Sequence, residues 1–178
     1  MIPGEPTLAA QIARGVAEHA ANEVVFATAD GVREVTLAEL AADAERVAGA
    51  LQGQGIGPGD VVAVQLASTY EGTVAQAAVA MCGAVLLPIV QIYGPRELAF
   101  ILAQSQAVAL VVPETARGRA HAAPLFRGME RPAGLRHGVR RVRPPATARR
   151  RSLPRSAGSG RCGSGWWSTA APPSVRGW

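Results

Sequence analysis

Apolar residues in the first 115 positions recur with two spacings, one typical of helices and one typical of strands. The helical spacing over residues 8–19 predicts a short helix near the amino end. Two short apolar runs, 24–28 and 32–35, then flank Ala29-Asp30-Gly31, and an Asp-Gly pair is typical of a β-hairpin turn. An apolar stripe over residues 36–51 predicts a longer second helix after this hairpin.

Three further apolar runs, 61–66, 84–90 and 107–112, are nearly free of polar residues. Strands of this kind are usually covered on both faces, as in parallel sheets. Helical patterns lie between them, one starting near Tyr70 and one at Gly94-Pro95. Short connections between alternating strands and helices predict the fold class: α/β, with a parallel βαβαβ unit.

Several polar residues of this region are given structural interpretations. Thr36 with Glu39, and Ser68 with Glu71, have the Ser/Thr-x-x-Glu spacing of a capping box, in which the hydroxyl and the carboxylate each bind a free backbone amide. Glu39 and Glu71 are therefore interpreted as helix caps and not as catalytic acids. Tyr70 and Tyr93 are interpreted as packing or rim residues.

The chain changes its chemistry between residues 113 and 138. Twelve of the thirteen acidic residues lie at or before Glu114, whereas fourteen of the eighteen arginines lie after it. Residues 1–115 therefore carry a formal charge of −8, and residues 116–178 carry +13. Only seven of the last 63 residues are Leu, Ile, Val or Phe, too few to offset the entropy of ordering a backbone. We expect a packed unit over 1–115, or to 137, and a disordered Arg/Pro/Gly-rich tail over 116–178.

The front segment resembles the adenylate-forming superfamily, which includes acyl-CoA synthetases, peptide-synthetase adenylation domains and luciferases. The resemblance is carried by the helix at 36–51 with the Gly-Ile-Gly-Pro-Gly-Asp-Val-Val sequence at 55–62, and by Met-Cys-Gly-Ala-Val-Leu-Leu-Pro-Ile at 81–89. Gly-Pro-Arg-Glu-Leu at 94–98, with Ile92 and Tyr93 before it, is most similar to fatty-acyl or cyclohexanecarboxylate CoA ligases. The resemblance covers residues 7–115, or to His137.

This resemblance implies a chemistry that the chain itself does not carry. Intact relatives use ATP, Mg²⁺ and coenzyme A to convert a carboxylic acid through its adenylate into a thioester. Their phosphate loop, approximately Ser-Gly-Thr-Thr-Gly-x-Pro-Lys-Gly, and their catalytic lysine have no counterpart here, because the chain contains no lysine. We therefore expect no catalytic, cofactor-binding or metal-binding residues, and interpret the chain as an inactive, truncated ligase that lacks several hundred residues.

The tail allows several interpretations. Its richness in Arg, Ala, Gly and Pro is typical of GC-rich DNA translated in a wrong frame, so we expect a frameshift near residues 134–138. The Gly/Ser-rich run at 156–165 lacks the strand–loop–helix context of a phosphate site and is interpreted as a linker. Arginine clusters at 140–143 and 149–151, with Trp166 and Trp167, leave open non-specific nucleic-acid binding. A non-catalytic α/β binding module is a further alternative.

The remaining features indicate a cytoplasmic protein. Cys82 and Cys162 have no metal-type spacing, and Cys82 is interpreted as a small buried residue. The first residues do not resemble a signal peptide, and no apolar run is long enough to span a membrane. His121 and His137 are interpreted as solvated positions of the tail.

Overall fold

The computed structural model describes residues 7–28, 31–116, 119–139 and 150–151. The Gly/Ser-rich run, Cys162, Trp166, Trp167 and most of the two arginine clusters lie outside these residues, as does most of the predicted tail. The elements, in chain order, are α1 (Leu8–His19), β1 (Glu23–Thr28), β2 (Gly31–Thr36), α2 (Leu37–Gly53), β3 (Val61–Val64), α3 (Tyr70–Met81), β4 (Val85–Pro88), α4 (Pro95–Gln104), β5 (Ala109–Val111), β6 (Thr115–Ala116), β7 (Arg119–Ala120), α5 (Ala122–Gly128), β8 (His137–Val139) and β9 (Arg150–Arg151).

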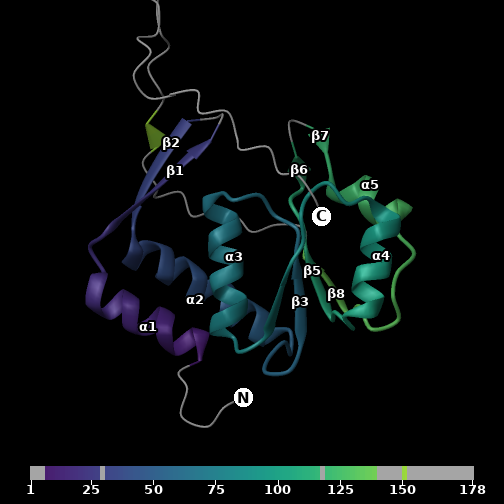
Figure 1. The fold of residues 1–178 in the computed structure, drawn as a ribbon, viewed down its shortest axis with the longest axis horizontal. Coiled ribbons are helices and arrows are strands. Elements are labelled where there is room, and N and C mark those ends of the chain that lie inside the picture. Colours follow the sequence, from purple (N-terminus) through teal and green to yellow (C-terminus); the bar gives the residue numbers. More distant parts are fainter. Residues whose placement is uncertain (1–6, 29–30, 117–118, 140–149, 152–178) are drawn as a thin grey trace, which may run out of the picture.

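A four-stranded parallel sheet in the order β4-β3-β5-β8 forms the centre of the fold (Figure 1). Val62 pairs with Leu86 of β4 on one side and with Ala109 of β5 on the other. β5 pairs in turn with β8. The predicted α/β class and the βαβαβ unit are confirmed, with β3, α3, β4, α4 and β5 as its elements. The strands are shorter than the apolar runs that predicted them.

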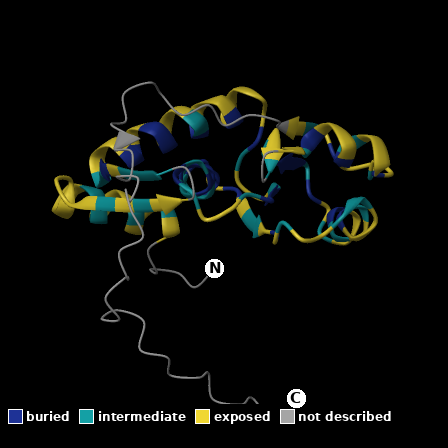
Figure 2. Cartoon of the chain, turned by 90° about the horizontal axis from the view of Figure 1, so that it is seen from above, coloured by how far each residue is buried: buried dark blue, intermediate teal, exposed yellow. Residues whose placement is uncertain are grey.

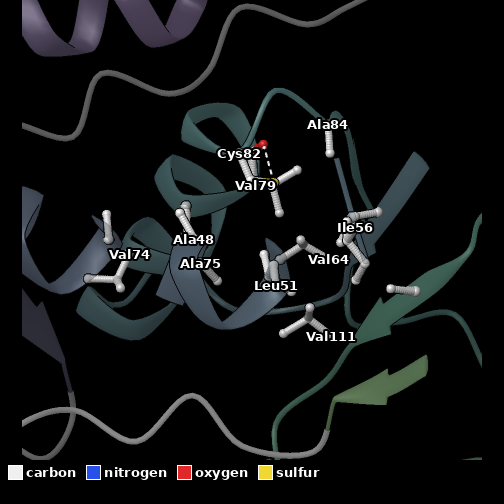
Figure 3. Packing of buried hydrophobic residues seen from close by; sticks show 14 of the residues in the cluster. Ala48, Leu51, Ile56, Val64, Val74, Ala75, Val79, Cys82, Ala84 and Val111 are labelled. Atoms are coloured by element: carbon white, nitrogen blue, oxygen red, sulfur yellow. Dashed lines mark hydrogen bonds between the residues drawn. The ribbon is translucent and has the colours of Figure 1, made fainter. Parts of the chain in front are cut away.

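Helices cover both faces of this sheet, as Figure 1 shows. Val62 and Val64 of β3 point into a core with α2 and α3, whereas Ala63 between them points into a second core with α4 and α5. Figure 3 shows the first core, where Leu51 of α2 and Val79 of α3 lie close to Val64. The nearly uninterrupted apolar strands follow from this two-sided burial.

The hairpin of β1 and β2 packs beside the first core. Its strands pair in antiparallel register from Glu23 with Thr36 to Thr28 with Gly31, which confirms the predicted hairpin. Phe26 packs against the core, and Val35 is buried in it. β9 pairs with the free side of β2. The helix α1 lies against α2 and α3 and buries none of its residues completely, so it covers the core from outside (Figure 2).

Local sequence determines where the helices begin and end. The Thr36 hydroxyl accepts the Glu39 amide at 3.2 Å, and the Glu39 carboxylate accepts the Thr36 amide at 2.8 Å, so the first predicted capping box is confirmed. Beyond α2 and α3, Gly55 and Gly83 adopt positive φ of 77° and 78°, a region that favours glycine.

The second predicted capping box is wrong. α3 begins one residue later than the pattern predicts, because Thr69 is its N-cap and accepts the Gly72 amide at 3.3 Å. Ser68 therefore lies outside the helix, and the Glu71 carboxylate binds Arg33 at 3.2 Å instead of a backbone amide. Both threonine and serine can cap a helix, so the sequence alone does not show which of Ser68 and Thr69 is the N-cap of α3.

The buried core extends beyond residue 115. Ala122, Leu125, Met129 and Leu135 are buried in the second core with α4. These positions lie beyond the shorter predicted bound of the packed unit, 115, and within the longer one, 137; few apolar residues are present in the last third of the chain. The four residues are concentrated at helical and turn positions facing the sheet, so a small number is enough to cover it.

No helix among the described residues is long and apolar enough to cross a membrane.

Candidate functional site

The carboxyl edge of the central sheet is the place where parallel α/β folds usually bind ligands. They do so where neighbouring strands connect in opposite directions. Here that point lies between β3 and β5: the chain leaves β3 towards β4 on one side, and leaves β5 towards β8 on the other. The first residue after β3 is Gln65, whose amide still donates to the Val111 carbonyl of β5 at 2.9 Å.

Gln65 is completely buried at this point, with 0% of its surface exposed. Its side chain continues the alternation of β3 and faces the same core as Ala63. The Gln65 Nε2 donates to the carbonyls of Val90 at 3.1 Å and Tyr93 at 3.0 Å. Its Oε1 lies 3.4 Å from His121 Nε2. A buried side-chain amide of this kind needs its partners, because an unpaired polar group in a core is costly.

The interpretation of His121 as a solvated tail residue is wrong. His121 is half-buried and precedes α5, where its amide donates to the Glu114 carbonyl at 2.8 Å. This bond joins the two ends of the segment that contains β6 and β7, residues 114–121. His121 therefore lies near the carboxyl end of β5, at the edge of the sheet. His137 is also half-buried, as the first residue of β8.

The loop between β4 and α4 lies at the same edge and exposes apolar side chains. Val90 is 55% exposed, Ile92 82% and Tyr93 40%. Tyr93 therefore lies at the rim, one of the two positions predicted for it. Clustered exposed apolar residues are typical of surfaces that contact a ligand or other polypeptide.

A small pocket of about 150 Å³ lies between the hairpin and the start of α3. It is lined by Phe26, Thr28, Gly31, Val32, Arg33, Thr69, Tyr70 and Glu71. Arg33 dominates its chemistry: the guanidinium carbon lies 3.3 Å from the centroid of the Tyr70 ring, and Nη1 donates to Glu71. Arg33 Nε is buried without a partner in the described region, so a water or another acceptor can bind it there.

Tyr70 connects this pocket to the core. The ring is 3% exposed and packs edge-on against Phe26 at 5.5 Å, so the packing interpretation of Tyr70 is confirmed. Its hydroxyl donates to Asp43 Oδ2 at 2.6 Å, and Asp43 also pairs with Arg46. Burial of the hydroxyl raises the pKa of Tyr70 well above its ordinary value, and the hydrogen bond to Asp43 acts in the same direction.

Two further interpretations are confirmed. The hydrogen bond from the Thr36 backbone amide has the largest effect on the pKa of the Glu39 carboxyl and lowers it. The hydrogen bond from the Thr36 hydroxyl lowers this pKa further, as expected for a capping residue. Cys82 is 3% exposed and its thiol donates to the Val79 carbonyl, which fits a small buried residue (Figure 3).

These groups favour hydrogen bonding and packing over proton transfer. Among the described residues, no three His, Cys, Asp or Glu side chains lie close enough together to hold a metal ion. His121 Nε2 faces an amide and not a nucleophile. The connections from β3 to α3 and from β4 to α4 contain no glycine-rich run, so these two helix starts do not fit the phosphate groups of ATP.

Comparison with known protein families identifies the fold. The family described as AMP-binding enzyme matches residues 12–151, which is most of the chain. The chain belongs to this AMP-binding enzyme family. The relatives that are similar in sequence include two CoA ligases. The 2-hydroxy-7-methoxy-5-methyl-1-naphthoate–CoA ligase of Streptomyces carzinostaticus is 34% identical over 108 residues, 61% of this chain and 19% of the relative. The 3-oxocholest-4-en-26-oate–CoA ligase of Rhodococcus rhodochrous is 38% identical over 97 residues, 53% of this chain and 17% of the relative.

Solved structures of AMP-binding enzymes share the fold. A fatty acyl CoA synthetase of Mycobacterium tuberculosis superposes with a TM-score of 0.65 at 21% identity, over 76% of this chain and 26% of the other. The anthranilate CoA ligase AuaEII, solved with anthranoyl-AMP, gives a TM-score of 0.63 at 23% identity, over 77% of this chain and 25% of the other. The chain spans a fifth or less of the two curated relatives named above.

None of Gln65, Arg33 and His121 was predicted from the sequence as a residue of a site. One signal was available: Gln65 is the only polar residue in the apolar run 61–66, and it stands at the carboxyl end of that run. Arg33 has no comparable signal, because its partners lie far from it in the sequence.

Proposed function

We propose that this chain is the amino-terminal part of an ATP-dependent carboxylate–CoA ligase and that it does not catalyse adenylation by itself. The observation that carries the proposal is the family match over residues 12–151, combined with the small share of each relative that the chain spans. The relatives named above are CoA ligases, and the described residues fold as the corresponding part of solved ligases.

The absence of lysine from the 178 residues supports the proposed inactivity. The resemblance to this family implies a phosphate-binding lysine and a catalytic lysine, and neither can be present in a chain without lysine. For the intact ligase we propose a fatty or alicyclic acid as substrate, with ATP, Mg²⁺ and coenzyme A, and a cytoplasmic location. The relatives act on polycyclic or aromatic acids according to their names, which supports an apolar acid.

We place a change of reading frame between residues 134 and 151. The lower limit is where the composition becomes rich in arginine and loses acidic residues, and the upper limit is where the family match ends. β8 still pairs with β5 at Val139, which favours the later part of this interval.

The gene provides the first test. Its DNA, and the DNA downstream, would be sequenced again and translated in all three frames from the codon of Pro113. A second frame that encodes the Thr-Thr-Gly-x-Pro-Lys loop and a later catalytic lysine is the expected result. An uninterrupted frame with this tail, present in several relatives, would contradict the proposal.

Activity provides the second test. The purified chain is expected to give no acid-dependent exchange of pyrophosphate with ATP, and a frame-restored version of the gene serves as positive control. Exchange by the chain itself would contradict the proposed inactivity. Stabilisation of the chain by carboxylates or nucleotides would instead favour a binding module. RNA affinity that persists at physiological salt would favour nucleic-acid binding.

A further inference from the structure

The side chain of Gln65 joins three segments that are far apart in the sequence. It belongs to the end of β3, its Nε2 binds two carbonyls of the loop before α4, and its Oε1 faces the residue before α5. All three segments lie at the carboxyl edge of the sheet, and Gln65 is the buried polar group between them.

The chemistry of the partners determines which way the amide points. The Val90 and Tyr93 carbonyls can only accept hydrogen bonds, so both hydrogens of the Gln65 Nε2 must be directed at them. The Oε1 atom then has to face His121, and an oxygen can only accept there. His121 must therefore carry a proton on Nε2 to make this contact.

We propose that Gln65 is a positioning residue that fixes the 90–93 loop and the Nε2-protonated form of His121 at the carboxyl edge of the sheet. This goes beyond the proposed ligase function, because it concerns this chain whether or not it is part of a ligase. The loop exposes Ile92 and Tyr93, so the buried amide holds an apolar surface in place at the edge where such folds bind ligands.

The wild-type chain gives the first arm of the test. Long-range ¹H–¹⁵N spectra of the full chain at about pH 8.5, where an ordinary histidine is neutral, distinguish the two ring forms. We expect the His121 ring to be protonated on Nε2. A ring protonated on Nδ1 would overturn the proposal, because Gln65 Oε1 could not then accept from it.

Hydrogen exchange gives the second arm. In Gln65→Met, which keeps the volume and removes the amide, we expect the Tyr93 and His121 amides to exchange about tenfold faster than in wild type. Leu110, at the centre of the sheet, should change much less. Gln52→Met, on the exposed face of α2, is the matched control and should leave all three rates unchanged.

A third variant separates positioning from general stability. His121→Phe removes one partner and keeps both loop carbonyls bound to Gln65, so the Tyr93 amide should exchange at the wild-type rate. Equal acceleration of Tyr93 and Leu110 in Gln65→Met, or no acceleration of either, would overturn the proposal. If Gln65→Met does not fold, the ring form of His121 in the wild-type chain still decides it.

Discussion

The Tyr70 hydroxyl donates a 2.6 Å hydrogen bond to Asp43 Oδ2, and this contact joins α3 to α2 inside the first core. Both residues are nearly inaccessible, with 3% and 6% of their surfaces exposed. Asp43 also pairs with the more exposed Arg46, so the carboxylate is held from two sides. The Tyr70 ring in addition lies under the Arg33 guanidinium, so one side chain connects the core to the pocket beside the hairpin.

Removing the Tyr70 hydroxyl should destabilise the fold. Tyr70→Phe keeps the ring contacts with Phe26 and Arg33 and deletes one hydrogen bond to a buried carboxylate, so we expect a loss of about 1.5–3 kcal/mol in the free energy of unfolding. Urea denaturation followed by circular dichroism measures it. Tyr93→Phe, at the exposed rim, is the control and should change stability by less than about 0.5 kcal/mol.

The same hydroxyl should make stability depend on alkaline pH. The pKa of Tyr70 is higher in the folded state than in the unfolded state, so above pH ~10 the unfolded chain releases a proton that the folded chain retains. The stabilisation is complete below the unfolded pKa and is lost as pH rises, by up to about 1.4 kcal/mol per pH unit. Tyr70→Phe should show a flatter alkaline limb, and an unchanged limb would show that Tyr70 does not cause it.

Two glycines in helices should respond in opposite directions to alanine. A Cβ at Gly72 of α3 would collide with the Ala67 carbonyl oxygen, a backbone atom that cannot easily move. We expect Gly72→Ala to cost about 3 kcal/mol or to prevent folding. A Cβ at Gly49 of α2 would meet no atom within 4 Å. Gly49→Ala should therefore stabilise the chain by about 0.5–1 kcal/mol. Thermal unfolding of both variants tests the packing at the start of α3.

The capping box of α2 should weaken at acid pH. Thr36→Ala removes the hydroxyl that binds the Glu39 amide and should cost about 1 kcal/mol. The pKa of Glu39 is lowered, so its stabilisation is present above the ordinary value of 4.5 and is lost as pH falls through the folded pKa. Acid unfolding of Glu39→Gln should begin from a lower stability and depend less on pH in this range. Glu45→Gln, exposed on the same helix, is the control.

The ion pair between Arg136 and Asp60 should contribute modestly to attaching β8. The two residues are 76 positions apart and their closest atoms, Nη2 and Oδ1, are 2.7 Å apart. Asp60 Oδ2 also accepts the Gly57 amide at 3.0 Å. A double-mutant cycle of Asp60→Asn and Arg136→Gln should give a coupling of about 0.5–1 kcal/mol that decreases in high salt. A coupling near zero at low salt would show that β8 is held by its pairing with β5 and by packing, without a contribution from this ion pair.

Most of the fold could be predicted from the sequence because its signals are local. The capping box at Thr36 and the Asp-Gly turn each involve neighbouring residues, and the apolar runs reveal a sheet that is covered on both faces. The start of α3 could not be predicted in the same way. Ser68 and Thr69 are adjacent capping residues, and the sequence does not show that Glu71 binds Arg33 of the hairpin, 38 positions earlier.

The site was harder to predict because it is formed by contacts between distant segments. His121 was assigned to a tail because its surroundings in the sequence are basic and poor in apolar residues. In the structure its role depends on Gln65, 56 positions earlier, and on the main chain of Glu114. The sequence around Gln65, at the end of an apolar strand, indicates that this residue is buried. It does not indicate which residues Gln65 contacts.

The central place of β3 in the sheet also determines the order in which the sheet can assemble on the ribosome. β4 and β5 pair with β3, and β8 pairs with β5, so each later strand meets a partner that has already been synthesised. Each of these strand pairs can therefore form as soon as its later strand has been synthesised. An event that alters translation after residue 139 leaves both members of each of these strand pairs unchanged.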